Sequence, residues 1–437
     1  MQETQNYSEK GGFLKDQRRV IVGWAFFDWA NSAFALVITA AIFPGYFLQV
    51  TNDVIWVGSL RMSNSTLYSW SITLAYLLIA AISPLLSGIS DYGNRRKVFL
   101  RFFTTVGAMA CISLLFFRGM ETLWVGVTGF VLAMIGFAGG IVFYNSFLPL
   151  IATEERYDSV SALGFSLGFF GSVILLTLNL IVITFYDAFG FSEALKAVPV
   201  AFVMVGLWWL GFAQIPFRRL PEDQPTADRL RPLMRKGYAE IVRIWRYVKS
   251  DRNMLRYLMA FFAFNAGVNA VLYIAAIFAE KELAFSTSGL IILILILQLV
   301  AIVGATLSTM LSKRKGNKWA LMLQLSLWLI VCAGGYYVQT GLDFYVLACM
   351  VGMVMGGVQA LARSTYAKLL PEGTSDTASF FSFYDVMDKL STVAGTFVFG
   401  LVEQITGGMR DSVLAMAVLF LAGMILLSGF RVQKKAV

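Results

Sequence analysis

Four charged residues lie within stretches of sequence that are otherwise strongly apolar. They are Asp28, Arg363, Asp385 and Lys389. A charge at the centre of a membrane-spanning helix costs roughly 2.5–3.5 kcal/mol on insertion scales, so such residues are kept where they serve a function. A chain that keeps four of them uses them to hold a substrate, an ion or a conformational lock. The charges therefore indicate a transporter.

The carboxylates in these stretches outnumber the cations. Asp28, Asp385 and Asp388 stand against Arg363 and Lys389, which leaves one carboxylate in excess. Because burial disfavours an unpaired charge, we expect one of the acids, Asp28 first, to take up and release a proton during transport. Asp385 and Lys389 are four residues apart, so they could act as a gate or proton-coupling pair, or could form a local ion pair that only stabilises the helix.

Uncharged polar residues in other apolar stretches could complete a binding site. Asn265, Asn269 and Tyr273 recur every four residues and therefore share one face of a helix. Further candidates for substrate contact are Asn31, Tyr144, Asn145, Gln298 and Gln359. Amides and phenols suit a zwitterion or a polyol, although the same groups also form hydrogen bonds between helices. Arg363 would bind a substrate carboxylate or, alternatively, a phosphate head group.

Twelve long apolar stretches must position these residues. The chain of 437 residues is 58% hydrophobic and 14% charged, whereas soluble domains are about half apolar and a quarter charged. Several stretches exceed the roughly 20 residues that span a bilayer, which predicts an all-α integral membrane protein. We expect helices at about 20–48, 66–90, 98–117, 122–149, 159–184, 194–217, 254–279, 287–311, 317–338, 343–369, 378–404 and 412–430. Gly352 and Gly356 have the spacing that is typical of close packing between such helices.

The composition argues against several other functions. Without a histidine, the chain lacks Ser-His catalysis, histidine zinc sites and histidine proton relays, so any proton carrier must be Asp or Glu. The cysteines, Cys111, Cys332 and Cys349, lie in apolar stretches without C-x-x-C spacing, as expected of packing residues. The sequence contains no nucleotide-binding P-loop, which argues against a primary pump. We therefore expect neither an enzyme nor a bound metal or cofactor.

Basic residues are unevenly divided among the connections between the apolar stretches. Most of the 35 Lys and Arg residues fall at the two ends of the chain and in the even-numbered connections. By the positive-inside rule, this bias predicts that both termini are cytoplasmic in a multi-pass protein of the cell (inner) membrane. The net charge of +9 has the same origin and does not indicate binding of nucleic acid.

One long polar segment divides the apolar stretches into six and six. Residues 218–253 would form a cytoplasmic linker between a six-helix bundle at 1–217 and another at 254–437. Within this linker, the stretch from Leu233 to Lys249 is basic and amphipathic, which is typical of a helix at a membrane surface.

A basic turn follows the second apolar stretch of each half, which indicates a six-plus-six repeat. In the first turn, Asp91, Arg95 and Arg96 fall on G-x-x-x-D-R/K-x-G-R/K-R/K, with Ser87 at the first glycine position. This pattern resembles the major facilitator superfamily, and the resemblance implies that these three residues form a conformational latch. In the second turn Arg314 stands where the aspartate would be, so we expect an asymmetric latch.

Finer features resemble the vacuole-effluxer family of autophagy-related amino-acid effluxers. Four motifs carry the resemblance, at Trp24–Phe34, Phe143–Pro149, Gly356–Ser364 and Phe380–Asp385. Two positions where that family commonly has acidic residues hold Leu150 and Ala266 here.

The resemblance implies a fold of twelve transmembrane helices in two six-helix pseudo-repeats. Such a protein works by alternating access and, within that superfamily, as a monomer. The implied cargo is a small polar solute, with amino acids first, and the implied mode is proton-coupled efflux. The alternative is a lipid or lysophospholipid transporter, or flippase, on the same fold, in which a head group would meet Arg363.

Overall fold

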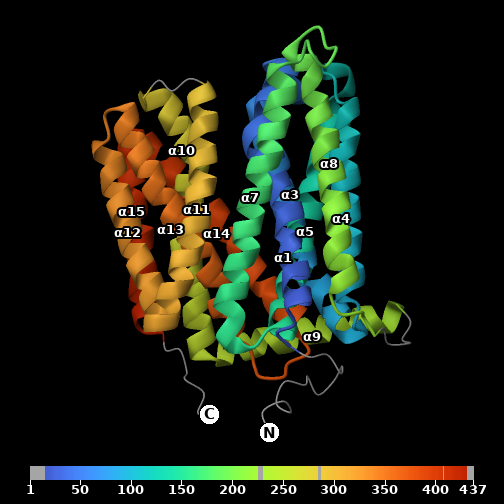
Figure 1. Ribbon diagram of the computed structural model, residues 1–437, viewed down its shortest axis with the longest axis vertical. Coiled ribbons are helices and arrows are strands. Elements are labelled where there is room, and N and C mark those ends of the chain that lie inside the picture. The colour runs from blue at the N-terminus through green and yellow to red at the C-terminus, as the bar shows by residue number, and fades with distance from the viewer. Residues whose placement is uncertain (1–14, 225–229, 284–286, 407, 431–437) are drawn as a thin grey trace. The chain divides into compact units, whose positions relative to one another are not determined.

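The computed structural model is helical almost throughout (Figure 1). It describes residues 15–224, 230–283, 287–406 and 408–430. The first half contains α1 (Arg18–Ala33), η1 (Phe34–Ile42), α2 (Phe43–Val50), β1 (Val54–Val57), β2 (Leu60–Ser63), α3 (Asn64–Gly93), α4 (Arg96–Ser113), η2 (Leu114–Phe116), η3 (Met120–Thr122), α5 (Leu123–Ser146), α6 (Leu148–Ile151), η4 (Glu154–Arg156), α7 (Tyr157–Thr184) and α8 (Ala194–Arg219). The second half contains α9 (Leu230–Ser250), α10 (Arg252–Leu283), α11 (Thr287–Lys315), α12 (Asn317–Tyr337), α13 (Gly341–Leu369), α14 (Thr377–Thr406) and α15 (Met409–Ser428).

In the described part of the chain, eleven helical stretches are long and apolar enough to cross a membrane, judged by length and composition. Each corresponds to one of the expected helices. The remaining expected helix is α14, which is 30 residues long but contains Asp385, Asp388 and Lys389 and many hydroxyl side chains. These polar groups lower its apolar character. The all-α fold is therefore confirmed, whereas an exact count of twelve spanning helices is not.

The chain forms two compact units that do not follow chain order strictly. The first unit comprises residues up to 147 and 167–238, and the second comprises 148–166 and the residues from 239 onward. The two units share α7, because its residues 157–166 pack in the second unit and its later residues in the first. The bundle and linker boundaries expected from the sequence remain a prediction.

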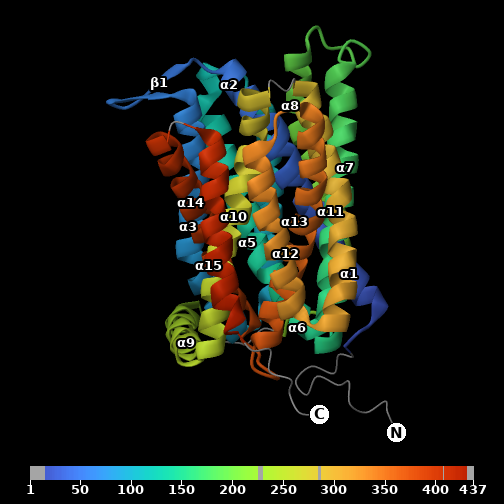
Figure 2. The same cartoon turned by 90° about the vertical axis from the view of Figure 1, so that its left-hand side faces the viewer.

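A short β-hairpin interrupts the helices between α2 and α3, and the sequence analysis did not predict it. Val54 pairs with Ser63 and Val57 pairs with Leu60 in an antiparallel register. The turn between the strands contains Gly58 with φ of +63°, a conformation that glycine adopts without strain. Figure 2 shows the hairpin at the same end of the first unit as α2.

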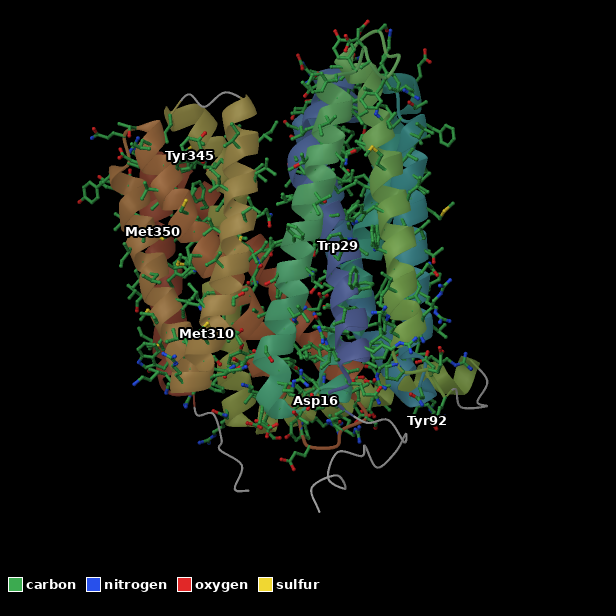
Figure 3. All side chains as sticks on the ribbon, in the orientation of Figure 1. Asp16, Trp29, Tyr92, Met310, Tyr345 and Met350 are labelled. Carbon is green, nitrogen blue, oxygen red and sulfur yellow. The ribbon has the colours of Figure 1, made fainter. Side chains whose placement is uncertain are left out.

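Aromatic stacking ties α1 to α8 within the first unit. The ring of Trp29, which is labelled in Figure 3, stacks on that of Trp208 with centroids 5.4 Å apart, and Trp208 Nε1 donates a 3.1 Å hydrogen bond to the backbone oxygen of Trp29. Trp209 is fully buried and stacks on Phe34 at 5.4 Å. Because these large rings lock α1 in place, they also fix the position of Asp28 on that helix.

Glycines allow the closest helix contacts in the second unit. A Cβ at Gly395 would overlap the backbone oxygen of Ala266, so α10 and α14 touch at backbone level there. A Cβ at Gly356 would overlap the backbone oxygen of Ala301, and one at Gly352 would lie 2.7 Å from that of Leu297. The packing role predicted for Gly352 and Gly356 is therefore confirmed, with α11 as the partner of α13.

The amphipathic helix expected in the linker forms as α9 and runs crosswise to α10 and α15 (Figures 1 and 2). Within the second unit its apolar side packs on the start of α14. The rings of Trp245 and Phe383 stack at 5.7 Å, and Tyr247 meets Phe380 edge to face at 5.6 Å. The chain therefore fastens α9 to the first turns of the helix that carries Asp385.

Candidate functional site

Three charged residues lie within little more than one turn of α14. Lys389 Nζ lies 3.0 Å from Asp385 Oδ1 and 2.7 Å from Asp388 Oδ2. Their spacing of three and four residues places them on one face of the helix. Asp385 and Lys389 are only 2% and 5% exposed, whereas the side chain of Asp388 is 33% exposed, so the cluster is buried at Asp385 and Lys389 and partly open at Asp388. The local pair of Asp385 and Lys389 is present, and Asp388 joins it.

Two amides of α10 complete this cluster. Asn265 Nδ2 donates hydrogen bonds of 2.8 Å to Asp388 Oδ1 and 2.7 Å to Ser391 Oγ. One turn later, Asn269 Nδ2 donates a 2.8 Å bond to the hydroxyl of Thr392. Two predicted substrate contacts thus connect α10 to α14 in this structure. Their role in binding substrate stays a prediction.

The α14 cluster contains more negative than positive groups. Asp385 and Asp388 share the single ammonium group of Lys389. Among the described residues, Asp385 Oδ2 is buried without a hydrogen-bond partner. With both carboxyl groups ionised the three residues carry a net negative charge, and one proton on either carboxyl would neutralise them. The arrangement can therefore exchange a proton without losing its ion pair.

Asp28 lies in an aromatic environment within the first unit. Its Oδ2 accepts a 2.7 Å hydrogen bond from the phenol of Tyr144, so α1 and α5 bring two predicted site residues together. Trp24 donates a 2.9 Å bond to the backbone oxygen of Tyr144, and the rings of Trp24 and Phe27 stack on that of Tyr144 at 4.3 and 4.7 Å. A Cβ at Gly168 would lie 3.3 Å from Asp28 Cβ, so a glycine lets α7 pass close to this carboxylate.

Asn31, three residues after Asp28, and Asn145, directly after Tyr144, are also buried. Among the described residues, Asn31 Oδ1 is buried without a hydrogen-bond partner. An unsatisfied amide oxygen of this kind can accept a hydrogen bond from a ligand.

Arg363 is fixed within the second unit by the first turns of α7. Its Nε donates a 2.9 Å bond to Ser161 Oγ, and its Nη2 donates a 2.8 Å bond to the backbone oxygen of Ser161. The guanidinium carbon lies 4.2 Å from the centre of the Phe165 ring, which adds a cation–π contact. The group that we expect to bind a substrate carboxylate is therefore engaged by the protein itself.

The remaining predicted substrate contacts are distributed along other helices of the second unit. Gln359 is half-buried on α13, one turn before Arg363. Gln298 is half-buried on α11, and its Oε1 has no hydrogen-bond partner among the described residues. The side chain of Tyr273 lies outside the described part of α10.

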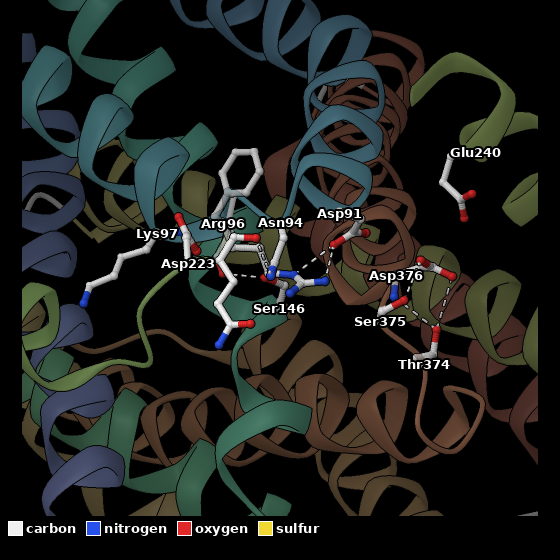
Figure 4. Close-up of polar contacts among 12 residues, drawn as sticks. Asp91, Asn94, Arg96, Lys97, Ser146, Asp223, Glu240, Thr374, Ser375 and Asp376 are labelled. Carbon is white, nitrogen blue, oxygen red and sulfur yellow. Dashed lines mark hydrogen bonds and ion pairs between the residues drawn. The ribbon is translucent and has the colours of Figure 1, made fainter. Parts of the chain in front are cut away.

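The turn between α3 and α4 contains the predicted latch residues. Arg96 binds Asp91 Oδ1 through Nε at 2.9 Å and through Nη2 at 2.7 Å (Figure 4). Both side chains are buried. Asn94, with φ of +50°, supplies the left-handed residue at which α3 ends. Arg95 does not join the ion pair with Asp91, and its buried Nε has no partner among the described residues. The latch role of all three residues stays a prediction.

The segment after α8 folds back onto this turn. Lys97 Nζ donates to the backbone oxygen of Leu220 at 2.9 Å and to Glu222 Oε1 at 2.6 Å. The carboxylate of Asp223 accepts hydrogen bonds from the backbone N–H groups of Lys97 and Val98, so it lies at the start of α4 where the helix dipole favours an anion. The hydrogen bond from Lys97 lowers the pKa of Glu222, whereas burial raises the pKa of Asp223.

The sequence matches the family model described as vacuole effluxer Atg22 like over residues 16–437. This chain belongs to the Atg22-like effluxer family. An uncharacterised major facilitator-type transporter of Bacillus subtilis (strain 168), YxiO, is 28% identical over 93% of this chain and 93% of its own length. Autophagy-related protein 22 of Vanderwaltozyma polyspora is 25% identical over 94% of this chain and 90% of its own length.

Solved structures of major facilitator transporters have the same fold as this Atg22-like protein. The human organic anion transporter MFSD10 has a TM-score of 0.70 at 16% identity, over 94% of this chain and 99% of that chain. The transporter FucP in its outward conformation has a TM-score of 0.68 at 14% identity, over 94% and 97%. At such low identity the likeness shows the fold alone. The resemblance stated from the motifs is confirmed, and the protein is a multi-pass secondary transporter of the major facilitator type.

Sequence reasoning missed a buried carboxylate of the Atg22-like protein, that of Asp158 in the first turn of α7. It is 3% exposed and forms an ion pair with Lys368 at 2.8 Å. The available signal was the basic turn of the second half, where Arg314 replaces the expected aspartate and an acid would have to come from elsewhere. Only the fold identifies α7 as its source.

Proposed function

We propose that this Atg22-like protein exports small polar solutes, amino acids first, by alternating access coupled to protons. The observation that carries the proposal is the cluster of Asp385, Asp388 and Lys389 inside α14. A site with one buried carboxylate, one half-buried carboxylate and one buried ammonium group is suited to binding and releasing a proton. The family description, vacuole effluxer, supports solute efflux as the mode of transport.

The charge of the proposed cargo follows from two buried residues of opposite sign. Asp28 in the first unit offers a carboxylate beside the Tyr144 ring, and Arg363 in the second unit offers a guanidinium. An amino acid contains a counter-charge of each kind, an ammonium group that suits a carboxylate and a carboxylate that suits a guanidinium. We assign secondary contacts with the cargo to the amides Asn31, Gln298 and Gln359, and the proposed contacts also include Tyr144, Asn145, Asn265, Asn269 and Tyr273.

The proposal includes the membrane topology. The positive-inside bias of the sequence supports cytoplasmic termini in the cell (inner) membrane. On the cytoplasmic side, a conformational latch would then be formed by Asp91, Arg95 and Arg96. The protein would act as a monomer that consists of two six-helix bundles.

Transport in proteoliposomes tests the proposal. Purified protein would be given a panel of amino acids with and without a pH gradient, and flux and current would be measured for wild type, D28N, D385N and the control D187N. Asp187 is exposed in the connection before α8, so D187N should behave as wild type. We expect pH-driven flux that is lost in D28N or D385N.

The outcomes separate the parts of the proposal. If both D28N and D385N keep full pH-driven transport, neither acid is the proton carrier. If no amino acid is transported while the same vesicles translocate a fluorescent lysophospholipid, the alternative lipid function replaces the proposed one, and Arg363 becomes a phosphate contact.

A further inference from the structure

Asp158 holds the start of α7 against three other helices of the second unit. Its Oδ1 accepts a 2.8 Å hydrogen bond from Asn317 on α12, and its Oδ2 accepts one of 2.8 Å from Lys368 on α13. The hydroxyl of Ser312 on α11 also donates to Oδ2. Lys368 in turn donates to Asn317 Oδ1 at 2.8 Å. One buried carboxylate thus organises four helix ends.

Ser161 and Phe165 follow Asp158 on the same face of α7, one and two turns later. Both hold Arg363, through two hydrogen bonds to Ser161 and the stacked ring of Phe165. Ser161 Oγ also donates to the backbone oxygen of Ala360 at 2.8 Å. Ala162, which follows Ser161 on α7, forms a small apolar core with Ala305 and Ala360, and Phe165 packs against it. The Asp158 cluster and the Arg363 contacts are therefore adjacent layers of one contact between α7 and α13.

We propose that Asp158 is a positioning residue for Arg363: its ion pair keeps α7 on α13 and thereby keeps the guanidinium bonded to Ser161 instead of to a ligand carboxylate. This inference rests on the proposed function, because it assumes that the carboxylate of a substrate competes with Ser161 for Arg363. The chemistry of the competition is direct, because the backbone oxygen of Ser161 and a carboxylate oxygen accept hydrogen bonds from the same N–H groups. Opening the Asp158 cluster frees those donors.

Loss of Asp158 should raise the affinity for a carboxylate ligand, because ligand binding is coupled to the release of Arg363 from Ser161. A ligand that binds only the released form of Arg363 has an apparent Kd equal to its intrinsic Kd divided by the released fraction. Removing the charge of Asp158 leaves the ammonium group of Lys368, whose side chain is 13% exposed, without its carboxylate, which disfavours the closed contact. A merely structural residue would weaken binding when mutated, whereas loss of Asp158 should strengthen it.

Chemical labelling of Arg363 tests the inference without reference to transport. Wild type, D158N, K368M, the charge-swapped double variant D158K/K368D and the control D187N would be reconstituted in nanodiscs and treated with phenylglyoxal. Mass spectrometry would then give the modification rate of Arg363, with the exposed Arg118 as an internal reference. Hydrogen exchange of residues 157–166 would be followed in the same samples.

We expect Arg363 to react about tenfold faster in D158N and K368M, together with faster exchange in α7, and the swap to restore the slow rate. An unchanged rate in D158N, or a fast rate in the swap, overturns the inference. Where D158N does not fold, S161A takes its place, since it removes one acceptor of Arg363 and should speed labelling while leaving the Asp158 cluster intact. For any solute that the transport panel identifies, D158N should lower the apparent Kd about tenfold, and a raised Kd contradicts the inference. Failure of the whole panel would refute the amino-acid cargo but leave the labelling result to decide the role of Asp158.

Discussion

Removing the lysine of the α14 cluster should destabilise the protein more than removing either of its acids. In K389M, Asp385 keeps a charge in a site that is 2% exposed, and its Oδ1 loses the ammonium group that lies 3.0 Å away. Asp388 loses its 2.7 Å contact at the same time but keeps the hydrogen bond from Asn265. The protein then contains an unpaired buried charge, which is the costly case.

The expected magnitudes follow from burial and from the number of partners. An unpaired buried charge costs about 3–5 kcal/mol, which is our expectation for K389M. D385N should cost only about 1–3 kcal/mol, because Lys389 keeps Asp388 as its partner. The double variant D385N/K389M removes the buried carboxylate together with the lysine, and should therefore be more stable than K389M alone. If a second substitution restores stability that the first one removed, the loss was caused by an unbalanced buried charge.

Unfolding of the purified protein in detergent, by denaturant or heat, would measure this order. The control is K196M, because Lys196 pairs with Glu193 at the surface, with side chains 59% and 64% exposed, and such pairs are worth about 0–1 kcal/mol. The reasoning fails if K389M is as stable as K196M, or if the double variant is less stable than K389M.

Three further predictions concern other contacts. G395A should destabilise by about 1–3 kcal/mol because its Cβ would meet a backbone oxygen of α10, whereas G400A on the same helix has nothing within 4 Å and should be neutral or slightly stabilising; equal melting temperatures would contradict this packing. Y144F should cost about 1.5–3 kcal/mol in unfolding experiments by removing the hydrogen bond to Asp28, and a neutral effect would show that the bond contributes nothing. Because Lys97 lowers the pKa of Glu222, their contact should be complete above pH 4.5 and be lost as the pH falls further; the protection of residues 220–224 against hydrogen exchange, corrected for the intrinsic rate at each pH, should fall with acid in wild type, and E222Q should lose that pH dependence.

The positions of the helices were predictable because a backbone in lipid must form its hydrogen bonds within its own segment. Each apolar stretch must satisfy its own hydrogen bonds, so its length and composition predict a helix whatever its neighbours are. The ends of α5, α8 and α12 lie within a few residues of the expected ranges. The hairpin at residues 54–63 escaped prediction, because strand pairing depends on register between two short segments and neither has a strong pattern alone.

The sequence by itself determined the class of protein, its family and most of the charged residues in its apolar stretches. The composition indicates a membrane protein because polar groups are costly in a bilayer and are therefore rare in its spanning helices. The four motifs and their order along the chain indicate the family. The tertiary structure alone decided which groups meet: that Asn265 binds Asp388 beside Lys389, that Tyr144 binds Asp28, and that Asp158 pairs with Lys368. Apart from the pair of Asp388 and Lys389, the partners in these contacts are more than a hundred residues apart in sequence. Only the packing of helices brings such groups within hydrogen-bond distance, and no local pattern in a single chain encodes that distance.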